Sequence, residues 1–293
     1  MNISGKTAVY GVIADPVAHT LSPLMHNSAI AEMGMDAVYV PFHVRPESLE
    51  HAVKGMTALG IGGLNVTVPH KTAVIDYLDS ITDEAKAVGA VNTIIGDDGV
   101  LTGDNTDVRG FLMCLIRDGG LERFPGRVCV LGAGGAARGV VYACASREEV
   151  TEITVINRTL SKAEKIAAEF SNITAASVTA APAVTDSLME MIPAAGLVVN
   201  TTSVGMIPDS GNSPVPDPGV FHDGQVVCDI VYNPVETRLL REAAEHGAKT
   251  VGGLAMLAYQ GARSLSLWTG REVPAEVMLR VLREWMIKKA GNK

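Results

Sequence analysis

The sequence predicts an α/β fold: an N-terminal α/β substrate domain with a mostly parallel sheet, a Rossmann-type dinucleotide-binding domain, and C-terminal helices that return to the first domain. Short β-rich runs alternate with helical patterns along most of the chain, which is typical of βαβ units. A glycine motif lies between a predicted strand and a predicted helix. The length of 293 residues favours two domains. We therefore predict a first domain over 1–106, completed by 253–293, and a second over 107–252.

The first hundred residues contain the alternation that predicts the first sheet. Strands and helices are expected in the order TAVYGVIA, Ser22 to Met33, AVYVPFHV, Pro46 to Leu59 and GGLNVTV. Two β-rich stretches then flank GDDG, a composition that favours a hairpin turn. We therefore expect an antiparallel pair to join the sheet, followed by a helix from Thr106 to Arg117.

The second domain begins after the glycine pair at 119–120. The pattern predicts strands at RVCVLGA, EITVINR, GLVVNTT and QVVCDIVY, with a helix from Ser161 to Phe170. Residues 203–219 are rich in Pro, Gly, Asp and Ser, which indicates a long loop. Two helices, Leu254 to Trp268 and Pro274 to Lys288, are expected at the end.

Composition limits the classes of function. Hydrophobic residues make up 47% and charged residues 19%, which is typical of a folded globular chain. The net charge is −8 and no dense Lys/Arg run occurs, which disfavours nucleic acid as a partner. No membrane-spanning segment or secretory signal is evident. The four cysteines form neither a CxxC pair nor a metal-ligand cluster, so we expect reduced thiols, no metal site and a cytoplasmic location.

The glycine motif LGAGGAARG predicts a dinucleotide site. Gly132, Gly134 and Ala137 form a G-x-G-x-x-A arrangement between a strand and a helix. The first glycine permits a tight turn, the second lets the backbone approach a pyrophosphate, and the alanine allows close helix–strand packing. The positive end of the helix dipole then faces the phosphates.

The end of the next strand indicates which nicotinamide cofactor is bound. An NAD enzyme usually carries an acid there for the ribose 2′-hydroxyl, whereas this chain has Asn157 and Arg158, with Thr159 and Lys162 close behind. A guanidinium binds a 2′-phosphate through charge-assisted hydrogen bonds. The alternative is a solvated cation at a helix start, which the helix dipole disfavours when no anion is present. The pattern therefore favours NADP over NAD.

Polar side chains gather at the ends of the first domain's strands. Thr20 and Ser22 precede a predicted helix; spacing alone favours helix capping, and a ligand carboxylate is the alternative. Lys71 is either a ligand-facing group or a solvated loop lysine. The other candidates lie in or beside predicted strands: Asn65, Thr67, Asn92, Asp104, Asn105 and Asp107. Together they indicate one hydrogen-bonding pocket at the carboxyl end of a sheet.

Nine motifs in order along almost the whole chain resemble the shikimate dehydrogenase family, whose frame quinate/shikimate dehydrogenases share. They are HTLSPLMHN, NVTVPHK, GAVNT, GDNTD, GAGGAAR, NRT, NTTSVGM, DIVYNP and GLAMLAYQ. The resemblance implies an NADPH-dependent, reversible reduction of 3-dehydroshikimate to shikimate, a step in making chorismate and the aromatic amino acids. It implies a small-molecule substrate and a monomer or homodimer.

The resemblance also implies roles for single residues. Lys71 and Asp107 would be the catalytic pair, with Lys71 exchanging the proton and Asp107 orienting it. The substrate would meet Thr20 and Ser22 at its carboxylate, Thr67, Asn92 and Gln260 at its hydroxyls, and Tyr232 nearby. The cofactor would meet Gly132, Ala133, Gly134, Gly135, Ala136, Asn157, Arg158, Thr159, Lys162, Ile230 and Gly253. Tyr232 and Gln260 have an alternative as satisfied core side chains, and Ile230 as an ordinary strand residue.

Two other functions stay open at this point. Thr20 stands where the family often has serine, and its extra methyl group keeps open a quinate/shikimate dehydrogenase that uses NAD or NADP. A catalytically silent sensor of the same metabolites is the alternative of another class. The presence of Lys71, Asp107 and the intact glycine loop argues against the sensor.

Overall fold

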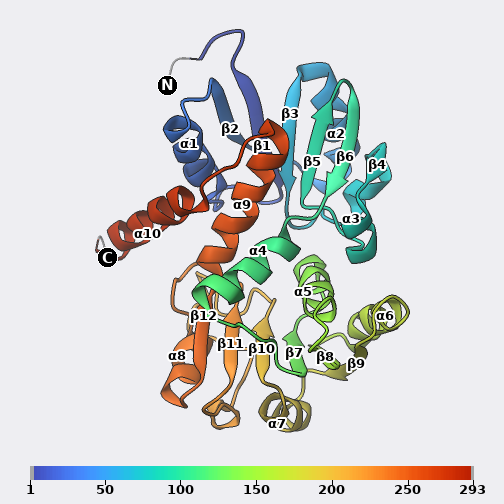
Figure 1. Ribbon diagram of the computed structural model, residues 1–293, viewed down its shortest axis with the longest axis vertical. Helices are drawn as coiled ribbons and strands as arrows, with labels where there is room; N and C mark the ends of the chain where they lie inside the picture. Colours follow the sequence, from blue (N-terminus) through green and yellow to red (C-terminus); the bar gives the residue numbers. More distant parts are fainter. Residues whose placement is uncertain (1–2, 292–293) are drawn as a thin grey trace. The chain divides into compact units, whose positions relative to one another are not determined.

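A computed structural model describes residues 3–291, which divide into two compact units (Figure 1). One unit runs to Gly110 and resumes at Ala258, and the other is Phe111–Leu257. The divisions predicted from the sequence, after residues 106 and 252, lie a few residues earlier in the chain.

The first unit is built on a six-stranded sheet in the order β2-β1-β3-β5-β6-β4. β1 pairs in parallel with β2 and β3, and β5 pairs antiparallel with β3 and β6. The predicted hairpin is confirmed: its turn places Asp98 and Gly99 at positive φ, 44° and 86°, as a tight hairpin turn requires. The strands are β1 (Ala8–Ala14), β2 (Ala37–His43), β3 (Ile61–Val66), β4 (Ser80–Ile81), β5 (Thr93–Asp97) and β6 (Val100–Asp104).

Helices pack their apolar sides against this sheet. In α2, Leu49, Val53 and Met56 repeat at helical spacing and are buried in one cluster with Leu64 and Val66 of β3. The helices that carry first-unit residues are α1 (Ser22–Glu32), α2 (Leu49–Leu59), α3 (Asp83–Val88), α4 (Asp107–Met113), α9 (Gly253–Thr269) and α10 (Ala275–Gly291). α10 contacts α1, so the predicted return of the C-terminal helices to the first domain is confirmed.

The second unit has a six-stranded, all-parallel sheet in the order β12-β11-β10-β7-β8-β9. This is the strand order of a Rossmann fold, so the predicted fold class is confirmed. The order reverses between β7 and β10, and the glycine loop follows β7 at that point. The strands are β7 (Arg127–Leu131), β8 (Glu152–Asn157), β9 (Ser177–Pro182), β10 (Leu197–Asn200), β11 (Val226–Asp229) and β12 (Lys249–Gly252).

The second unit contains four elements that the sequence analysis did not assign: β9, β12, α7 (Thr185–Ala194) and α8 (Arg238–Glu245). Both strands lie at the edges of the sheet, β12 has only four residues, and α7 contains Pro193 near its end, so these three elements lack a strong pattern. The other two helices are α5 (Gly135–Ala145) and α6 (Leu160–Ser171). Between β10 and the short helical turn Pro218–Val220 the chain is irregular, as predicted.

One predicted helix has a different form. The expected run from Thr106 to Arg117 is an α-helix only over Asp107–Met113, and a π-helical turn, Cys114–Asp118, follows it. Gly119 ends that turn by donating its N–H to the Cys114 carbonyl at 3.0 Å. Within residues 3–291, no helix is both long enough and apolar enough to span a membrane.

Candidate active site

Lys71 and Asp107 form a salt bridge in the first unit. Lys71 lies in the loop after β3, and Asp107 is the first residue of α4, where a carboxylate suits the positive end of the helix dipole. The Lys71 Nζ lies 2.5 Å from Asp107 Oδ2, and the two side chains are only 15% and 8% exposed. The predicted catalytic residues are therefore in direct contact in a largely buried position.

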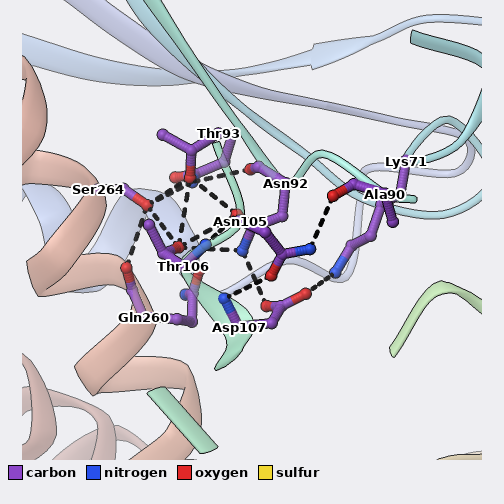
Figure 2. Close-up of polar contacts among 10 residues, drawn as sticks. Lys71, Ala90, Asn92, Thr93, Asn105, Thr106, Asp107, Gln260 and Ser264 are labelled. Carbon is purple, nitrogen blue, oxygen red and sulfur yellow. Dashed lines mark hydrogen bonds and ion pairs between the residues drawn. The ribbon is translucent and has the colours of Figure 1, made fainter. Parts of the chain in front are cut away.

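Two asparagines hold the other side of Asp107. The Asn92 Nδ2 donates to Asp107 Oδ1 at 2.8 Å, and the Asp107 N–H donates to Asn105 Oδ1 at 3.1 Å. Asn105 is itself anchored, because its Nδ2 donates to the Ala90 carbonyl at 2.8 Å. Asp107 thus accepts bonds on both carboxylate oxygens, one from a cation and one from an amide (Figure 2).

A buried polar cluster, formed by the side chains of Asn65, Asn92, Thr93, Thr106 and Ser264, lies behind this pair (Figure 2). Ser264 comes from α9, Asn65 from β3 and Thr93 from β5. Asn92 lies just before β5, and Thr106 lies in the loop before α4. Every member has a side-chain partner within the cluster, as buried polar groups require. No pattern in the sequence singles out Thr93, Thr106 or Ser264; the nearest signal is that Ser264 follows Gln260 by one helical turn.

Thr20 and Ser22 lie at the start of α1, and their hydroxyls are 3.2 Å apart. The helix-capping role that spacing favoured is confirmed only in part, because the N-cap residue is Leu21, which makes no side-chain cap bond, and Thr20 lies one residue earlier. The Thr20 hydroxyl instead accepts the Ser22 N–H at 3.2 Å. Thr67, just after β3, is half-buried, and its hydroxyl has no bond to the residues that the structure describes.

Gln260 lies on α9 and is buried with a relative exposure of 9%. A Cβ added at Gly110 of α4 would lie 2.8 Å from the Gln260 Cβ. The glycine therefore lets α4 and α9 approach closely where both belong to the first unit. The carboxylate of Asp107 and the amide of Gln260 are in this way carried by two tightly packed helices.

A buried histidine supports the backbone of Ser22. The His26 Nδ1 lies 2.9 Å from the Ser22 carbonyl, and its ring stacks on Tyr39 at 4.0 Å between centroids. Burial, which disfavours the imidazolium, lowers the pKa of His26 to about 4. The Tyr39 hydroxyl in turn donates to Asn65 Oδ1 at 2.8 Å, which joins this pair to the buried polar cluster.

The glycine loop of the second unit has the form that a pyrophosphate site needs. Gly132 has φ of 113°, and a Cβ there would lie 2.5 Å from the Thr201 hydroxyl, so only glycine fits. A Cβ at Gly134 would meet no atom within 4 Å, so the space beside this backbone is open. No side chain caps α5, which leaves its first N–H groups available to an anion. Ala133, Gly135 and Ala136 complete the loop and are partly exposed.

The start of α6 is basic. Arg158, Thr159 and Lys162 are exposed, no acidic residue lies in the first turn, and no side chain caps the helix. Asn157 holds the turn because its Nδ2 donates to the Thr159 carbonyl at 2.8 Å. Arg158 has no ion-pair partner among the described residues. A phosphate dianion is the kind of group that suits this combination.

The remaining predicted cofactor and substrate residues follow β11 and β12. Ile230 and Tyr232 are half-buried in the loop after β11, and burial raises the pKa of the Tyr232 hydroxyl. Gly253, the first residue of α9, is fixed as glycine because an added Cβ would overlap the Ile230 carbonyl. The loops after β11 and β12 therefore touch at this position.

Asp229 is a buried residue that the sequence analysis missed. It ends β11, and its carboxylate accepts the Asn200 amide at 2.9 Å, the Val231 N–H at 3.0 Å and the Thr237 hydroxyl at 2.7 Å. Burial raises its pKa to about 6, although these three bonds act in the opposite direction. Asp229 thus ties together the ends of β10 and β11 and the N-cap residue of α8.

Family models match three stretches of this chain. The shikimate dehydrogenase substrate-binding domain matches residues 12–94, the shikimate 5′-dehydrogenase C-terminal domain matches 253–283, and the saccharopine dehydrogenase NADP-binding domain matches 128–204. The first two lie mainly in the first unit and the third in the second unit.

Whole-chain relatives agree with these models. The shikimate dehydrogenase (NADP+) of Moorella thermoacetica is 44% identical, with 100% of this chain and 98% of the relative covered. The Thermus thermophilus shikimate 5-dehydrogenase, solved with NADP(H) and shikimate, is 37% identical at a TM-score of 0.83, with 94% and 99% of the two chains covered. The Corynebacterium glutamicum quinate dehydrogenase, solved with NAD, is 30% identical at a TM-score of 0.87, with 95% and 99% covered. This chain therefore belongs to the shikimate dehydrogenase family.

Proposed function

We propose that this protein catalyses the reversible, NADPH-dependent reduction of 3-dehydroshikimate to shikimate, a step toward chorismate and the aromatic amino acids. The observation that carries the proposal is the Lys71–Asp107 pair, a shielded cation held beside a carboxylate in the unit that matches a substrate-binding family model. Family membership supplies the substrate class. The first unit would then be the substrate-binding and catalytic domain, and the second the NADP-binding domain.

The reaction needs one proton and one hydride. NADPH, when bound, supplies the hydride to the ring carbon that carries the ketone. The Lys71 ammonium gives a proton to the ketone oxygen, which becomes the hydroxyl of shikimate, and solvent then reprotonates the Lys71 amine. Asp107 orients the lysine through the 2.5 Å contact, and Asn92 fixes the other carboxylate oxygen. General acid–base help of this kind is worth about 10²–10⁴-fold in rate.

Six residues are proposed to bind the substrate. Thr20 and Ser22, with adjacent hydroxyls at the start of α1, would bind the carboxylate, which the helix dipole also favours. Thr67, Asn92 and Gln260 would meet ring hydroxyls. Tyr232 would lie beside the substrate. These roles rest on the family resemblance, and the short distances among the first-unit residues support them.

NADP fits the second unit. The uncapped start of α5 and the open space beside Gly134 suit the pyrophosphate, and the basic start of α6 suits the 2′-phosphate. Arg158, Thr159 and Lys162 would hold that phosphate, with Asn157 shaping the turn. Ile230 and Gly253, which touch each other, would border the nicotinamide.

A quinate/shikimate dehydrogenase that uses NAD or NADP is the second candidate. Two observations favour it: the similarity to a quinate dehydrogenase solved with NAD, and the presence of Thr20 at the expected carboxylate site. Quinate has an additional hydroxyl on the carbon that bears the carboxylate. The methyl group of Thr20 would therefore lie where the two acids differ.

We also propose a cytoplasmic location, since all four cysteines are free and buried, and thiols persist in reducing compartments. A monomer or homodimer is proposed, and sedimentation would distinguish the two states.

The test is a spectrophotometric assay of shikimate-dependent NADP+ reduction by the purified protein. Quinate and NAD+ are run as the alternative substrate and cofactor at matched concentrations. We expect the highest kcat/KM with shikimate and NADP+. A higher value with quinate would favour the second candidate. Folded protein that binds shikimate without turnover would indicate a metabolite sensor instead of an enzyme.

A further inference from the structure

Ser264 occupies the centre of the buried polar cluster. Its side chain is fully buried on α9, and its Oγ lies 2.9 Å from Asn65 Nδ2, 2.8 Å from Thr93 Oγ1 and 3.1 Å from Thr106 Oγ1. Figure 2 shows it between β5, the loop before α4 and its own helix. The nearest of these contacts is 158 positions away in sequence, so Ser264 joins distant segments of the first unit.

The direction of the bonds at Ser264 is constrained. A serine hydroxyl has one hydrogen and two lone pairs. Its geometry toward the Gln260 carbonyl, at 3.0 Å and one helical turn earlier, makes that carbonyl the acceptor of the hydrogen. Ser264 Oγ can therefore accept two bonds, and the Asn65 amide supplies one of them at 2.9 Å.

The orientation of the Asn92 amide is constrained in the same way. Its Oδ1 accepts the Thr106 N–H at 2.8 Å, which places Nδ2 toward Thr106 Oγ1 at 3.0 Å and Asp107 Oδ1 at 2.8 Å. The second lone pair of Asn92 Oδ1 accepts the Thr93 hydroxyl at 3.0 Å. The Thr106 hydroxyl, although 3.2 Å from the same Asn92 oxygen, therefore accepts from Asn92 Nδ2 and sends its own hydrogen elsewhere. Ser264 Oγ, at 3.1 Å, is the nearest acceptor outside Asn92 itself.

We propose that Ser264 is a positioning residue for the reaction. By accepting the Thr106 hydroxyl, it keeps the Thr106 oxygen facing Asn92, so that Asn92 donates to Asp107 and Asp107 holds Lys71. The bonds run in one direction, from Asn92 through Thr106 and Ser264 to the Gln260 carbonyl. The inference rests on the proposed function, in which Asp107 orients Lys71.

The test compares Ser264→Ala with Ser266→Ala. Ser266 lies on the same helix and makes the same backbone bond, to the Ala262 carbonyl at 2.8 Å. Its hydroxyl also accepts the Val273 N–H at 3.2 Å, and among the described residues it has no hydrogen bond to the cluster. We expect Ser264→Ala to lower kcat for shikimate oxidation by about 3- to 10-fold, the effect of one lost hydrogen bond. We expect Ser266→Ala to retain wild-type kcat, and both variants to bind NADPH normally. Equal kcat in the two variants would overturn the proposal.

A double-mutant cycle with Asn92→Ala separates positioning from general loosening of the fold. If Ser264 acts through Asn92, adding Ser264→Ala to Asn92→Ala lowers kcat no further. If the fold-loss of kcat in the double variant equals the product of the two single-variant losses, the proposal is overturned. If Ser264→Ala does not fold, Thr106→Val removes the Thr106–Ser264 hydrogen bond from the threonine side. We then expect the same loss of kcat and the same non-additivity with Asn92→Ala.

A crystal structure of Ser264→Ala tests the proposal without an activity measurement. We expect the 2.8 Å contact between Asn92 Nδ2 and Asp107 Oδ1 to lengthen or break. An unchanged contact would overturn the positioning role, whatever the activity. Absence of shikimate oxidation in the wild-type protein would instead overturn the proposed function.

Discussion

Asp107 and Asp229 are buried carboxylates with different kinds of partner. In the first unit, Asp107 faces the Lys71 ammonium at 2.5 Å and the Asn92 amide at 2.8 Å. In the second unit, Asp229 is fully buried and accepts only from neutral donors. A nearby cation offsets the cost of burying a carboxylate, whereas neutral donors offset it incompletely. The pKa of Asp229 is accordingly raised to about 6.

The different partners of Asp107 and Asp229 indicate different roles, one in the reaction and one in the structure. The ion pair of Asp107 keeps some exposure, 15% at Lys71, so a substrate can reach the cation. Asp229 has no exposure and connects three segments of its own unit. We therefore expect changes near Asp107 to affect turnover, and changes at Asp229 to affect the pH dependence of stability.

The largest effect is expected from Lys71→Ala, which removes the cation from Asp107 and leaves it with neutral partners, as at Asp229. Because Lys71 delivers the proton in the proposed reaction, turnover should fall on the order of 10²-fold or more. NADPH affinity, measured by fluorescence titration, should stay nearly unchanged.

The matched control for that prediction is Lys54→Ala. Lys54 is a highly exposed lysine of the same unit that pairs with Glu50. Its removal should leave turnover near the wild-type value. Near-normal turnover in Lys71→Ala would remove Lys71 from the catalytic role.

His26 is a buried titratable residue of the first unit, as Asp229 is of the second. Burial lowers the pKa of His26, whereas it raises the pKa of Asp229. Its pKa in the folded protein is about 4, below the ordinary value of 6.5, because burial disfavours the charged ring. Its stabilising contribution is therefore present above pH 6.5 and is lost as the pH falls toward 4, by about 3 kcal/mol. Urea unfolding followed by tryptophan fluorescence measures this unit, since Trp268 and Trp285 both lie in it.

The variant that isolates this effect is His26→Phe, which keeps a ring against Tyr39 and cannot titrate. Its stability between pH 6.5 and 4 should decline less than that of the wild type by about 3 kcal/mol. His51→Gln changes an exposed histidine of α2 and serves as the control. Parallel pH curves for His26→Phe and the wild type would contradict the prediction.

Asp229 should destabilise its unit as the pH rises. Its folded pKa of about 6 exceeds the unfolded value near 3.8, so the folded state binds the proton more tightly. Its contribution is present below about pH 4 and is lost as the pH rises through 6, by roughly 2–3 kcal/mol. Asp229→Asn should remove this slope, whereas Asp223→Asn, at an exposed position, should keep it. Hydrogen exchange of the β10 and β11 amides is the measurement, and equal slopes in the two variants would refute the assignment.

The sequence predicted more of the fold where the hydrophobic pattern is strong. β7, β8 and the hairpin of β5 and β6 were predicted because β-branched runs are bounded by glycine or aspartate turns. α7 and β9 were not, because small residues and Pro193 give neither a helical nor a strand pattern. The π-helical turn after Met113 depends on local packing that no residue pattern encodes.

Some residues of the candidate site were likewise predicted from the sequence, and others were not. Lys71, Asn92 and Asp107 were predicted because each lies near a recognisable strand and in a family motif, and the structure places Asp107 in contact with the other two. Ser264 and Asp229 were not predicted. Serine on a helix and aspartate after a strand are common, and only the partners brought by distant segments distinguish these two.

The smallest expected effect concerns the cations of the two units. Lys71 has a carboxylate partner in its own unit, whereas Arg158 has none among the described residues and stands at an uncapped helix start. Its partner should therefore be the 2′-phosphate of the cofactor. Arg158→Ala should weaken NADPH about 10-fold and NADH hardly at all, because only NADPH has that phosphate. Lys165→Ala, a change at another exposed cation of α6, should weaken neither. Equal losses for both cofactors in Arg158→Ala would mean that Arg158 acts on a group the two share, and the selectivity for NADP would then have to come from Thr159 or Lys162.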